Sequence, residues 1–361
     1  MPTQKKKNPS FLCVVALTCL LPLCAHAGSI SQINQSMEKP KNWAQIVQNS
    51  PFLLGETTTE TQGDISFQIT AYGTYPSLDG STVSVPMARE FARQHLALTE
   101  AELDAFVLFS TTHDAYVNLI EKKPNAGATL PFQGSILQED RPVDIFIGTE
   151  PSEDELALAA EKGVRLTLTP VCYDAFVFIV NAVNPIESLT VEQIRRIYGN
   201  NALYGGKPLY WEDLGVEGLF DDDQQTIIRS YTRPRNSGSQ TAMENLVMQG
   251  TPIAETGFYE VFGMGDLIDH MEDYANSRHG IGYTYLFYIN ALYKSAGIKT
   301  IAIDGVAPTE ENIRSGAYPF ATCYYAVTRE GESTDFIQWM TGPEGQKCIK
   351  QAGYIPYLEG V

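Results

Sequence analysis

Histidine and cysteine are scarce in this chain of 361 residues, which contains five histidines and six cysteines. They show no spacing typical of a metal site or a redox pair, and there is no His-Glu-x-x-His motif, no Gly-x-Ser-x-Gly turn and no Walker-type phosphate loop. A hydrolase of phosphate esters would need a nucleophile with a neighbouring base, or a pair of metal ions. We therefore predict that the protein is not an enzyme and uses no cofactor and no metal.

Positive charge is also in short supply. The chain carries 25 lysines and arginines against 43 aspartates and glutamates, a formal net charge of -18. An acidic protein is repelled by nucleic-acid backbones and by anionic lipid surfaces, which excludes both as partners. At 43% hydrophobic residues the chain can bury a large core, and its length favours two lobes.

Long apolar runs are missing except near the N-terminus. Residues 5–7 are lysines, residues 11–24 form an apolar core, and Ala25-His26-Ala27 is a small-x-small cleavage site. We predict that residues 1–27 are a cleavable secretory signal peptide and that the protein is periplasmic or extracellular. Lipid attachment at Cys24 is the alternative, and the large Leu23 before that cysteine argues against it. Cleavage would remove three lysines, so that the net charge becomes about -21 (-18 less three).

Cleavage would also leave three cysteines, Cys172, Cys323 and Cys348. An odd number in an exported protein allows one disulfide and one free thiol. Cys323 lies in a strand-like run and Cys348 in the predicted final helix. We predict a bridge between these two, with Cys172 buried and reduced.

Residues 28–64 are rich in polar side chains, and we interpret them as a leader that packs outside the fold. Beyond them, strand-like runs alternate with runs of helical period. The predicted strands are 65–72, 106–109 and 143–147, and the predicted helices are 87–96, 113–121 and 153–162. This rhythm predicts a parallel α/β sheet.

Several turns between a predicted strand and the next helix carry hydroxyl or carboxylate groups, and such turns hold the ligands of open α/β sheets. They are residues 79–82, 110–114 and 148–152, with residues 235–241 as a fourth, placed before an apolar run at residue 242. Arg235 could grip two oxygens of an anion, while Ser239, Thr241 and the free N–H groups of a helix start would add donors. Each turn alone is also compatible with a plain helix cap, and Ser152 with Glu155 has the spacing of a capping box.

Together these segments resemble the phosphate-binding, type II periplasmic binding proteins that serve ABC transporters. The resemblance covers residues 66–357, and the order and spacing of the segments make it specific. The matching segments are residues 78–83 followed by Pro86, then 149–155, 178–185, 189–199, 235–241, 280–283, 318–320, 343–346 and 353–356.

The resemblance implies two α/β lobes joined by two crossover strands, with a ligand cleft between the lobes. Lobe one would comprise residues 65–170 and 290–361, and lobe two residues 171–289. A bound oxyanion would bridge the lobes and favour their closed arrangement. The resemblance also implies an ABC transporter permease as partner, and we expect a monomer.

The resemblance further implies a set of ligand-binding residues. They are Ser81, Thr82, the backbone at Val83, and Thr111 or Thr112 from the first lobe, and Arg235, Ser239, the N–H of Gln240 and Thr241 from the second. Glu150 takes the place of an aspartate and would accept a hydrogen bond from a protonated oxyanion such as HPO4, whereas sulfate has no proton to give. Three departures from the family stand out: Gln240 replaces a glycine, Glu150 is one methylene longer than aspartate, and Thr112-His113-Asp114 replaces a run of small Ser and Gly residues.

The interpretation that follows is capture of inorganic phosphate for an ABC transporter. Because of the departures, another small oxyanion or polar solute stays open as the ligand. A sensor or adhesion module with the same fold is an alternative function. An exported phosphate-ester hydrolase is another, for which the sequence supplies no nucleophile and base.

Overall fold

The computed structural model describes residues 75–96, 98–125, 127–132, 135–138, 140–199, 203, 209–216, 227–254, 258–272, 278–332, 335–358 and 360. The predicted signal peptide, the leader 28–64 and the predicted strand 65–72 lie outside the described residues. The first described strand is β1 (Leu78–Gly80).

One mixed sheet forms the frame of the described part. Its order is β1, β4 (Ile145–Gly148), β12 (Ala321–Arg329), β5 (Leu166–Asn181), β9 (Gly280–Tyr285), β7 (Arg229–Thr232) and β8 (Phe258–Glu260), with β10 (Ile298–Thr300) and β13 (Ile355–Pro356) also paired to β5. β1 is parallel to β4, and β7 is parallel to β8 and β9, whereas β12 is antiparallel to both β4 and β5. The prediction of a purely parallel sheet is wrong, because β12 returns from the C-terminal part of the chain and enters between two earlier strands.

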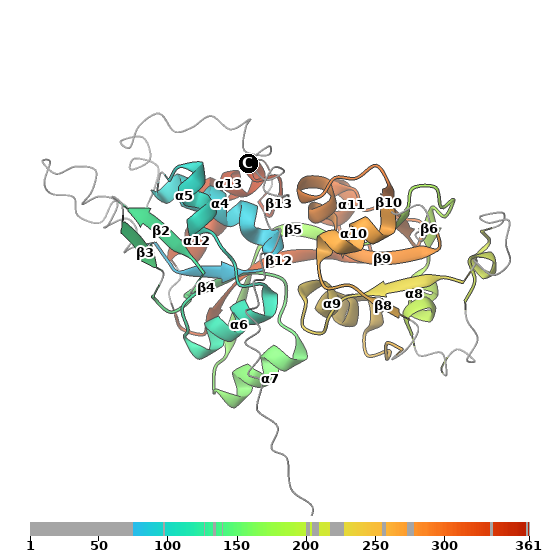
Figure 1. Ribbon diagram of the computed structural model, residues 1–361, viewed down its shortest axis with the longest axis horizontal. Helices are drawn as coiled ribbons and strands as arrows, with labels where there is room; N and C mark the ends of the chain where they lie inside the picture. Colours follow the sequence, from blue (N-terminus) through green and yellow to red (C-terminus); the bar gives the residue numbers. More distant parts are fainter. Residues whose placement is uncertain are drawn as a thin grey trace, which may run out of the picture. The chain divides into compact units, whose positions relative to one another are not determined.

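β5 is shared by two groups of elements. Its first part pairs with β12 and β13, and its second part pairs with β9 and β10. In Figure 1, helices α4 to α7, α12 and α13 surround β1 and β4, whereas α8 to α11 surround β7, β8 and β9. We call the first group lobe 1 and the second lobe 2.

Lobe 2 extends further along the chain than the predicted boundary at residue 289. β10 pairs with the end of β5, and β11 (Ala302–Ile303) pairs with β6 (Ser188–Leu189). After β9 the chain enters a π-helical stretch, Tyr288–Leu292, instead of crossing back. β12 is the strand that returns to lobe 1, so the strand pairing groups β10 and β11 with lobe 2, whereas the sequence analysis expects residues 290–361 in lobe 1.

The helices of lobe 1 that follow a strand begin near their predicted starts. α4 (Val85–Leu96), α6 (Thr112–Glu121) and α7 (Glu153–Glu161) match the predicted helices. At the start of α7, the Ser152 hydroxyl accepts from the Glu155 N–H, and the Glu155 carboxylate accepts from the Ser152 N–H. The capping-box spacing in the sequence is therefore a real helix start.

The predicted strand 106–109 is wrong. Residue 106 ends a helix, α5 (Glu100–Phe106), which begins with a capping box of Thr99 and Glu102. Leu103 and Phe106 are buried at helical spacing, and a four-residue apolar run is too short to reveal that period.

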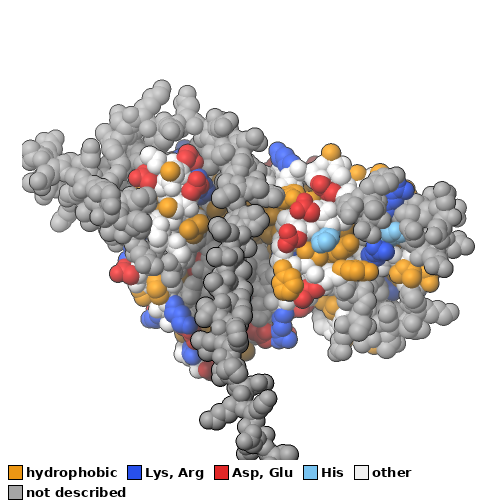
Figure 2. Space-filling view, viewed as in Figure 1, with side chains coloured by type: hydrophobic (Ala, Val, Ile, Leu, Met, Phe, Trp, Pro, Cys, Tyr) orange, Lys and Arg blue, Asp and Glu red, His pale blue; other side chains and the backbone are white. Residues whose placement is uncertain are grey.

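The other elements complete the two lobes. They are β2 (Thr129–Phe132), β3 (Ser135–Gln138), α8 (Val191–Tyr198), α9 (Gly238–Ala242), the π-helical stretch Met243–Met248, α10 (Met264–Glu272), α11 (Glu310–Arg314), α12 (Asp335–Thr341) and α13 (Pro343–Gln351). Among the described helices, none has the length and apolar character that a membrane crossing requires. Acidic and basic side chains are interspersed over the described part of the face seen in Figure 2.

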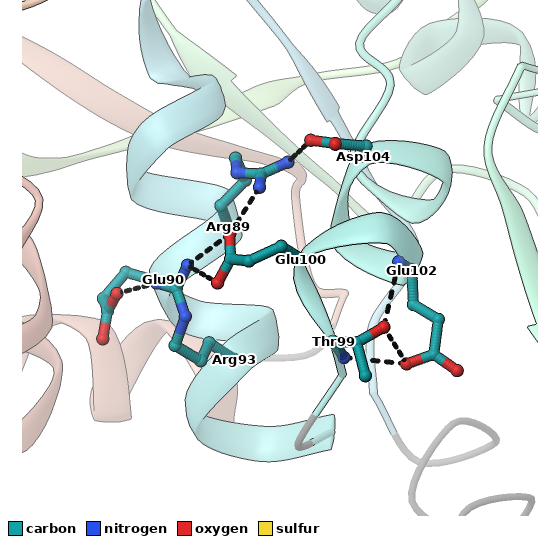
Figure 3. A network of polar contacts seen from close by, with 7 residues as sticks. All are labelled: Arg89, Glu90, Arg93, Thr99, Glu100, Glu102 and Asp104. Carbon is teal, nitrogen blue, oxygen red and sulfur yellow. Dashed lines mark hydrogen bonds and ion pairs between the residues drawn. The ribbon is translucent and has the colours of Figure 1, made fainter. Parts of the chain in front are cut away.

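An ion-pair network fixes α4 against α5 (Figure 3). The buried Arg89 binds Glu100 at 3.0 Å and Asp104 at 2.5 Å, and the buried Arg93 binds Glu100 at 2.9 Å and also contacts Glu90. Burial raises the pKa of Glu90, and the neighbouring Arg93 charge opposes that rise. The network holds α4, the helix that follows the cavity residues 81–83.

The three cysteines of the described part are all free thiols, so the predicted bridge between Cys323 and Cys348 is wrong. Cys172 is buried and reduced, as expected. Burial raises the pKa of Cys323 to about 11 and that of Cys348 to about 12. Both thiols are therefore protonated and unreactive near neutral pH.

Candidate functional site

A cavity of about 530 Å³ lies between elements of lobe 1 and lobe 2. Three helix starts contribute to it: residues 81–83 before α4, residues 111–113 at α6, and residues 237–239 at α9. The lining is Ser81, Thr82, Val83, Thr111, Thr112, His113, Arg233, Pro234, Arg235, Asn236, Ser237, Gly238, Ser239, Phe262, Gly263, Met264, Gly265, Tyr285 and Tyr288. Helix starts carry unpaired N–H groups and a partial positive charge, so their convergence suits an anion.

The first helix start is held by a buried carboxylate. Asp79 accepts hydrogen bonds from the N–H groups of Gly80 and Ser110, both at 2.8 Å, which ties this turn to the segment before α6. A Cβ on Gly80 would lie 2.0 Å from the carbonyl oxygen of Ile147, so only glycine fits there. Ser81, Thr82 and Val83, three of the predicted ligand-binding residues, line the cavity.

The second helix start has an unusual backbone. Thr111 has φ = +78°, a conformation that β-branched residues seldom adopt, and its side chain makes no capping bond. Thr111 and Thr112 both line the cavity, together with His113, which sequence reasoning missed. The His113 Nδ1 lies 3.0 Å from a carboxylate oxygen of Glu155, a fully buried side chain whose pKa is raised by burial.

The third helix start lies earlier than predicted. α9 begins at Gly238, and the hydroxyl of Ser237 caps it by accepting from the Gln240 N–H at 3.3 Å. Ser237, Gly238 and Ser239 therefore line the cavity, while Gln240 and Thr241 do not. The Gln240 amide donates to Glu244 at 3.0 Å and accepts from the Tyr283 hydroxyl, so it serves the packing of lobe 2.

Two arginines, Arg233 and Arg235, reach the cavity in very different states. The Arg235 side chain is 74% exposed and donates to Asp154 of lobe 1 through Nε at 2.7 Å and Nη2 at 2.5 Å. Arg233 is 8% exposed, and its Nε and Nη1 atoms have no hydrogen-bond partner among the described residues. Arg235, which the sequence predicts as the anion-binding arginine, is therefore solvated and paired with Asp154, whereas Arg233 is the arginine removed from water.

A sequence signal for this arrangement exists. Ser237 precedes Gln240 by three residues, which is the spacing of a capping box, and it sets the helix start four residues before the apolar run at residue 242. With this start, Ser237 is the N-cap, Gly238 is the first residue of α9, and Arg233 lies four residues before the N-cap.

Glu150 lies outside the main cavity. Its carboxylate accepts from the Tyr325 hydroxyl at 3.1 Å and lines a separate cavity of about 10 Å³ together with Thr241. Among the described residues that line the larger cavity, there is no carboxylate. Glu150 thus lines the smaller cavity, which shares Gly238 and Tyr285 with the larger one, and its role as acceptor of the ligand's proton stays a prediction.

The two lobes touch beside the cavity. A Cβ on Gly238 would lie 2.6 Å from the Thr149 hydroxyl oxygen and 3.2 Å from that of Thr112, both on lobe 1. The Tyr285 hydroxyl donates to the Gly238 carbonyl at 3.3 Å. Glycine at this position permits the close approach of α9 to lobe 1.

The described residues contain no cluster of three or more histidine, cysteine, aspartate or glutamate side chains arranged to hold a metal ion. The polar side chains in the cavity lining bear hydroxyl, guanidinium, amide and imidazole groups.

Comparison with known proteins gives the family context. The model of the PBP superfamily domain matches residues 99–344. The phosphate-binding protein PstS of Pseudomonas aeruginosa is 26% identical over 216 residues, covering 55% of this chain and 63% of its own length. PstS of Bacillus subtilis is 26% identical over 194 residues, covering 51% of this chain and 57% of its own length. The matched stretch thus spans less than two thirds of these relatives.

Solved structures show the fold. A protein of Clostridium perfringens assigned as a phosphate ABC transporter substrate-binding protein, with bound phosphate, has a TM-score of 0.54 and 20% identity over 78% of this chain and 99% of its own. An ABC-type phosphate transport receptor of Vibrio cholerae has a TM-score of 0.51 and 19% identity over the same shares. The described chain has the two-lobed type II periplasmic-binding-protein fold that the sequence predicts.

Proposed function

The chain belongs to the PBP superfamily, and we propose that it is an extracytoplasmic solute-binding protein that captures inorganic phosphate or a related tetrahedral oxyanion between its lobes. The relatives named as phosphate-binding proteins, and the C. perfringens structure with bound phosphate, support this ligand class. Delivery to an ABC transporter permease follows as the proposed role, with the monomer as the working unit.

The observation that carries the proposal is the state of Arg233. A guanidinium removed from water needs an anion or hydrogen-bond acceptors, and two of its nitrogens have none among the described residues. Burial lowers the pKa of Arg233, and nearby groups including Asp266 only partly oppose this. An oxyanion at the three helix starts would supply the missing acceptors and could be gripped through two oxygens.

The proposed binding residues are those at the cavity. From lobe 1 they are Ser81, Thr82, Val83, Thr111 and Thr112, and from lobe 2 they are Arg233, Ser237, Gly238 and Ser239. Arg235 instead joins the two lobes at the edge of the cavity, through its hydrogen bonds to Asp154, and does not contact the ligand. Ligand contacts from both lobes would stabilise the closed arrangement relative to an open one.

Selectivity should differ from that of a site with a carboxylate. Without a carboxylate among the described lining residues, sulfate meets no repelling charge at close range, and phosphate finds no charged acceptor for its proton. We therefore expect phosphate and sulfate to bind within about tenfold of each other, since the deciding charge is absent.

Isothermal titration of the purified protein tests the proposal. Phosphate, sulfate and an uncharged sugar of similar size are titrated at neutral pH and at two salt concentrations. Saturable binding of phosphate with one site, and no binding of the sugar, is the expected result. If no tetrahedral oxyanion binds, the proposed function is wrong.

A further inference from the structure

The cavity is larger than a bare oxyanion requires. Its volume is about 530 Å³, whereas a phosphate ion with five non-hydrogen atoms fills on the order of two or three water volumes, roughly 60–90 Å³. The three helix starts and Arg233 account for one side of the lining. The opposite side of the lining is formed by residues 262–265 and Tyr288.

That second surface is apolar and has little side-chain bulk at its centre. It is formed by residues 262–265, which lead into and begin α10, and by Tyr288. Phe262 is 75% exposed, and Gly263 and Gly265 on either side of Met264 carry no side chain. A Cβ on Gly265 would lie 3.2 Å from Cε2 of Tyr293 and 3.6 Å from the Tyr288 hydroxyl, so the glycine lets these two side chains pack against the start of α10.

The apolar surface adjoins the oxyanion side directly. The hydroxyl of Ser239 lies 3.8 Å from the sulfur of Met264, and the hydroxyl of Thr284 lies 3.4 Å from the same atom. The Arg233 charge is also close enough to Tyr288 to affect its pKa. Burial raises the pKa of Tyr288 to about 12, and the Arg233 charge opposes that rise. A substituent on an oxyanion bound at Ser239 and Arg233 would therefore meet Met264 and Tyr288 next.

The charges at the cavity limit the nature of that substituent. Its described lining includes two arginines and no carboxylate, and the nearby Asp266 carboxylate, behind Gly263, already faces the buried Arg233 charge. An ammonium group would therefore have to share that one carboxylate with Arg233. An uncharged alkyl or small aromatic group would instead bury apolar area against the methionine and the aromatic rings.

We propose that the site takes a compact phosphonate or phosphomonoester with an uncharged organic group, the phosphoryl oxygens at the helix starts and Arg233 and the organic group against Met264 and Tyr288. This inference rests on the proposed function, since it requires the same oxyanion side. It adds a substrate class that a bare ion would not need.

The test compares the purified protein's affinity for inorganic phosphate, methylphosphonate, propylphosphonate and 2-aminoethylphosphonate by isothermal titration. Each methylene buried against the apolar wall should tighten binding about fourfold. Propylphosphonate is expected to bind at least as tightly as phosphate, and 2-aminoethylphosphonate at least tenfold more weakly than propylphosphonate.

Two substitutions at one position should move the preference in opposite directions. Met264→Ala enlarges the apolar part and should raise the ratio of propylphosphonate to phosphate affinity, while Met264→Phe fills it and should lower that ratio. Met340→Leu, in the core of lobe 1, is the matched control and should leave the ratio unchanged. The ratio is read on folded protein only, checked by its thermal unfolding.

The outcomes separate the two proposals. If phosphate binds but propylphosphonate binds more than 100-fold more weakly, or if neither Met264 variant shifts the ratio, the substrate class is wrong and the proposed function stands. If none of the phosphoryl ligands binds, the proposed function itself fails.

Discussion

Replacing Arg233 by methionine should make the unliganded protein more stable and its ligand binding weaker. The guanidinium is 8% exposed, and its Nε and Nη1 atoms have no hydrogen-bond partner among the described residues. Methionine has a similar length and no charge to desolvate. The two effects therefore have opposite signs, which a residue important only for packing would not produce.

The magnitudes follow from these contacts. Leaving a buried polar group unsatisfied costs about 1–3 kcal/mol, and more for a charge, so Arg233→Met should raise the free energy of unfolding without ligand by about that amount. With ligand, the variant loses a charge-assisted, bidentate contact worth about 2–5 kcal/mol. The dissociation constant for phosphate should then rise about 30-fold to 5,000-fold.

The matched control is Arg235→Met, two residues away. Its guanidinium is 74% exposed and paired with Asp154, and exposed ion pairs contribute little. Urea denaturation without ligand and titration with phosphate are measured for both variants. Loss of stability in Arg233→Met, or a larger loss of affinity in Arg235→Met, would refute the assignment of the buried arginine to the ligand.

Three further predictions concern the contact between the lobes and the crossover. Asp154→Asn weakens the rim contact to Arg235, whose hydrogen bonds hold the pKa of Asp154 at about 2, so phosphate affinity measured at low salt should fall by at most about fivefold and the loss should shrink at high salt. Burial raises the pKa of Asp174 from 3.8 to about 7, so the folded state keeps a proton that the unfolded state releases, and the free energy of unfolding should decline as pH rises from 4 to 7. In urea titrations Asp174→Asn should flatten that slope, and an unchanged slope would contradict the shift. Gly238→Ala places a Cβ 2.6 Å from the Thr149 hydroxyl and should weaken phosphate binding at least tenfold, with recovery in the double variant that adds Thr149→Ala. Unchanged phosphate affinity in Gly238→Ala would contradict this prediction and show that Thr149 can move away from the added Cβ.

Local chemistry made much of lobe 1 predictable from sequence. The spacing of Ser152 and Glu155 predicts the start of α7. The hydroxyls at residues 81–82 and 111–112 line the cavity because each lies in a segment that follows a strand or precedes a helix. The family resemblance supplied the two-lobed fold in the same way, through the order of such turns.

The rest depends on contacts that a linear pattern does not contain. Arg233 and Arg235 are two residues apart and chemically identical, and only the packing of lobe 2 and the position of Asp154 decide which one loses its water. The place of Glu150 in the smaller cavity likewise depends on tertiary contacts, because Tyr325, 175 positions away in sequence, donates a hydrogen bond to its carboxylate. Distant strand pairs of this kind also group β10 and β11 with lobe 2, which no local pattern reveals.

The position of β12 has a consequence for the order in which the protein can form. This strand lies between β4 and β5, and the bond from the Tyr324 hydroxyl to Asp174 spans 150 residues of sequence. A growing chain that ends before residue 321 carries two strands with facing, unpaired edges, and long-range pairing of this kind is slow. Lobe 1 is therefore the first lobe to be synthesised and the last to be completed, and premature termination anywhere before β12 leaves a lobe 1 sheet with a gap at its centre.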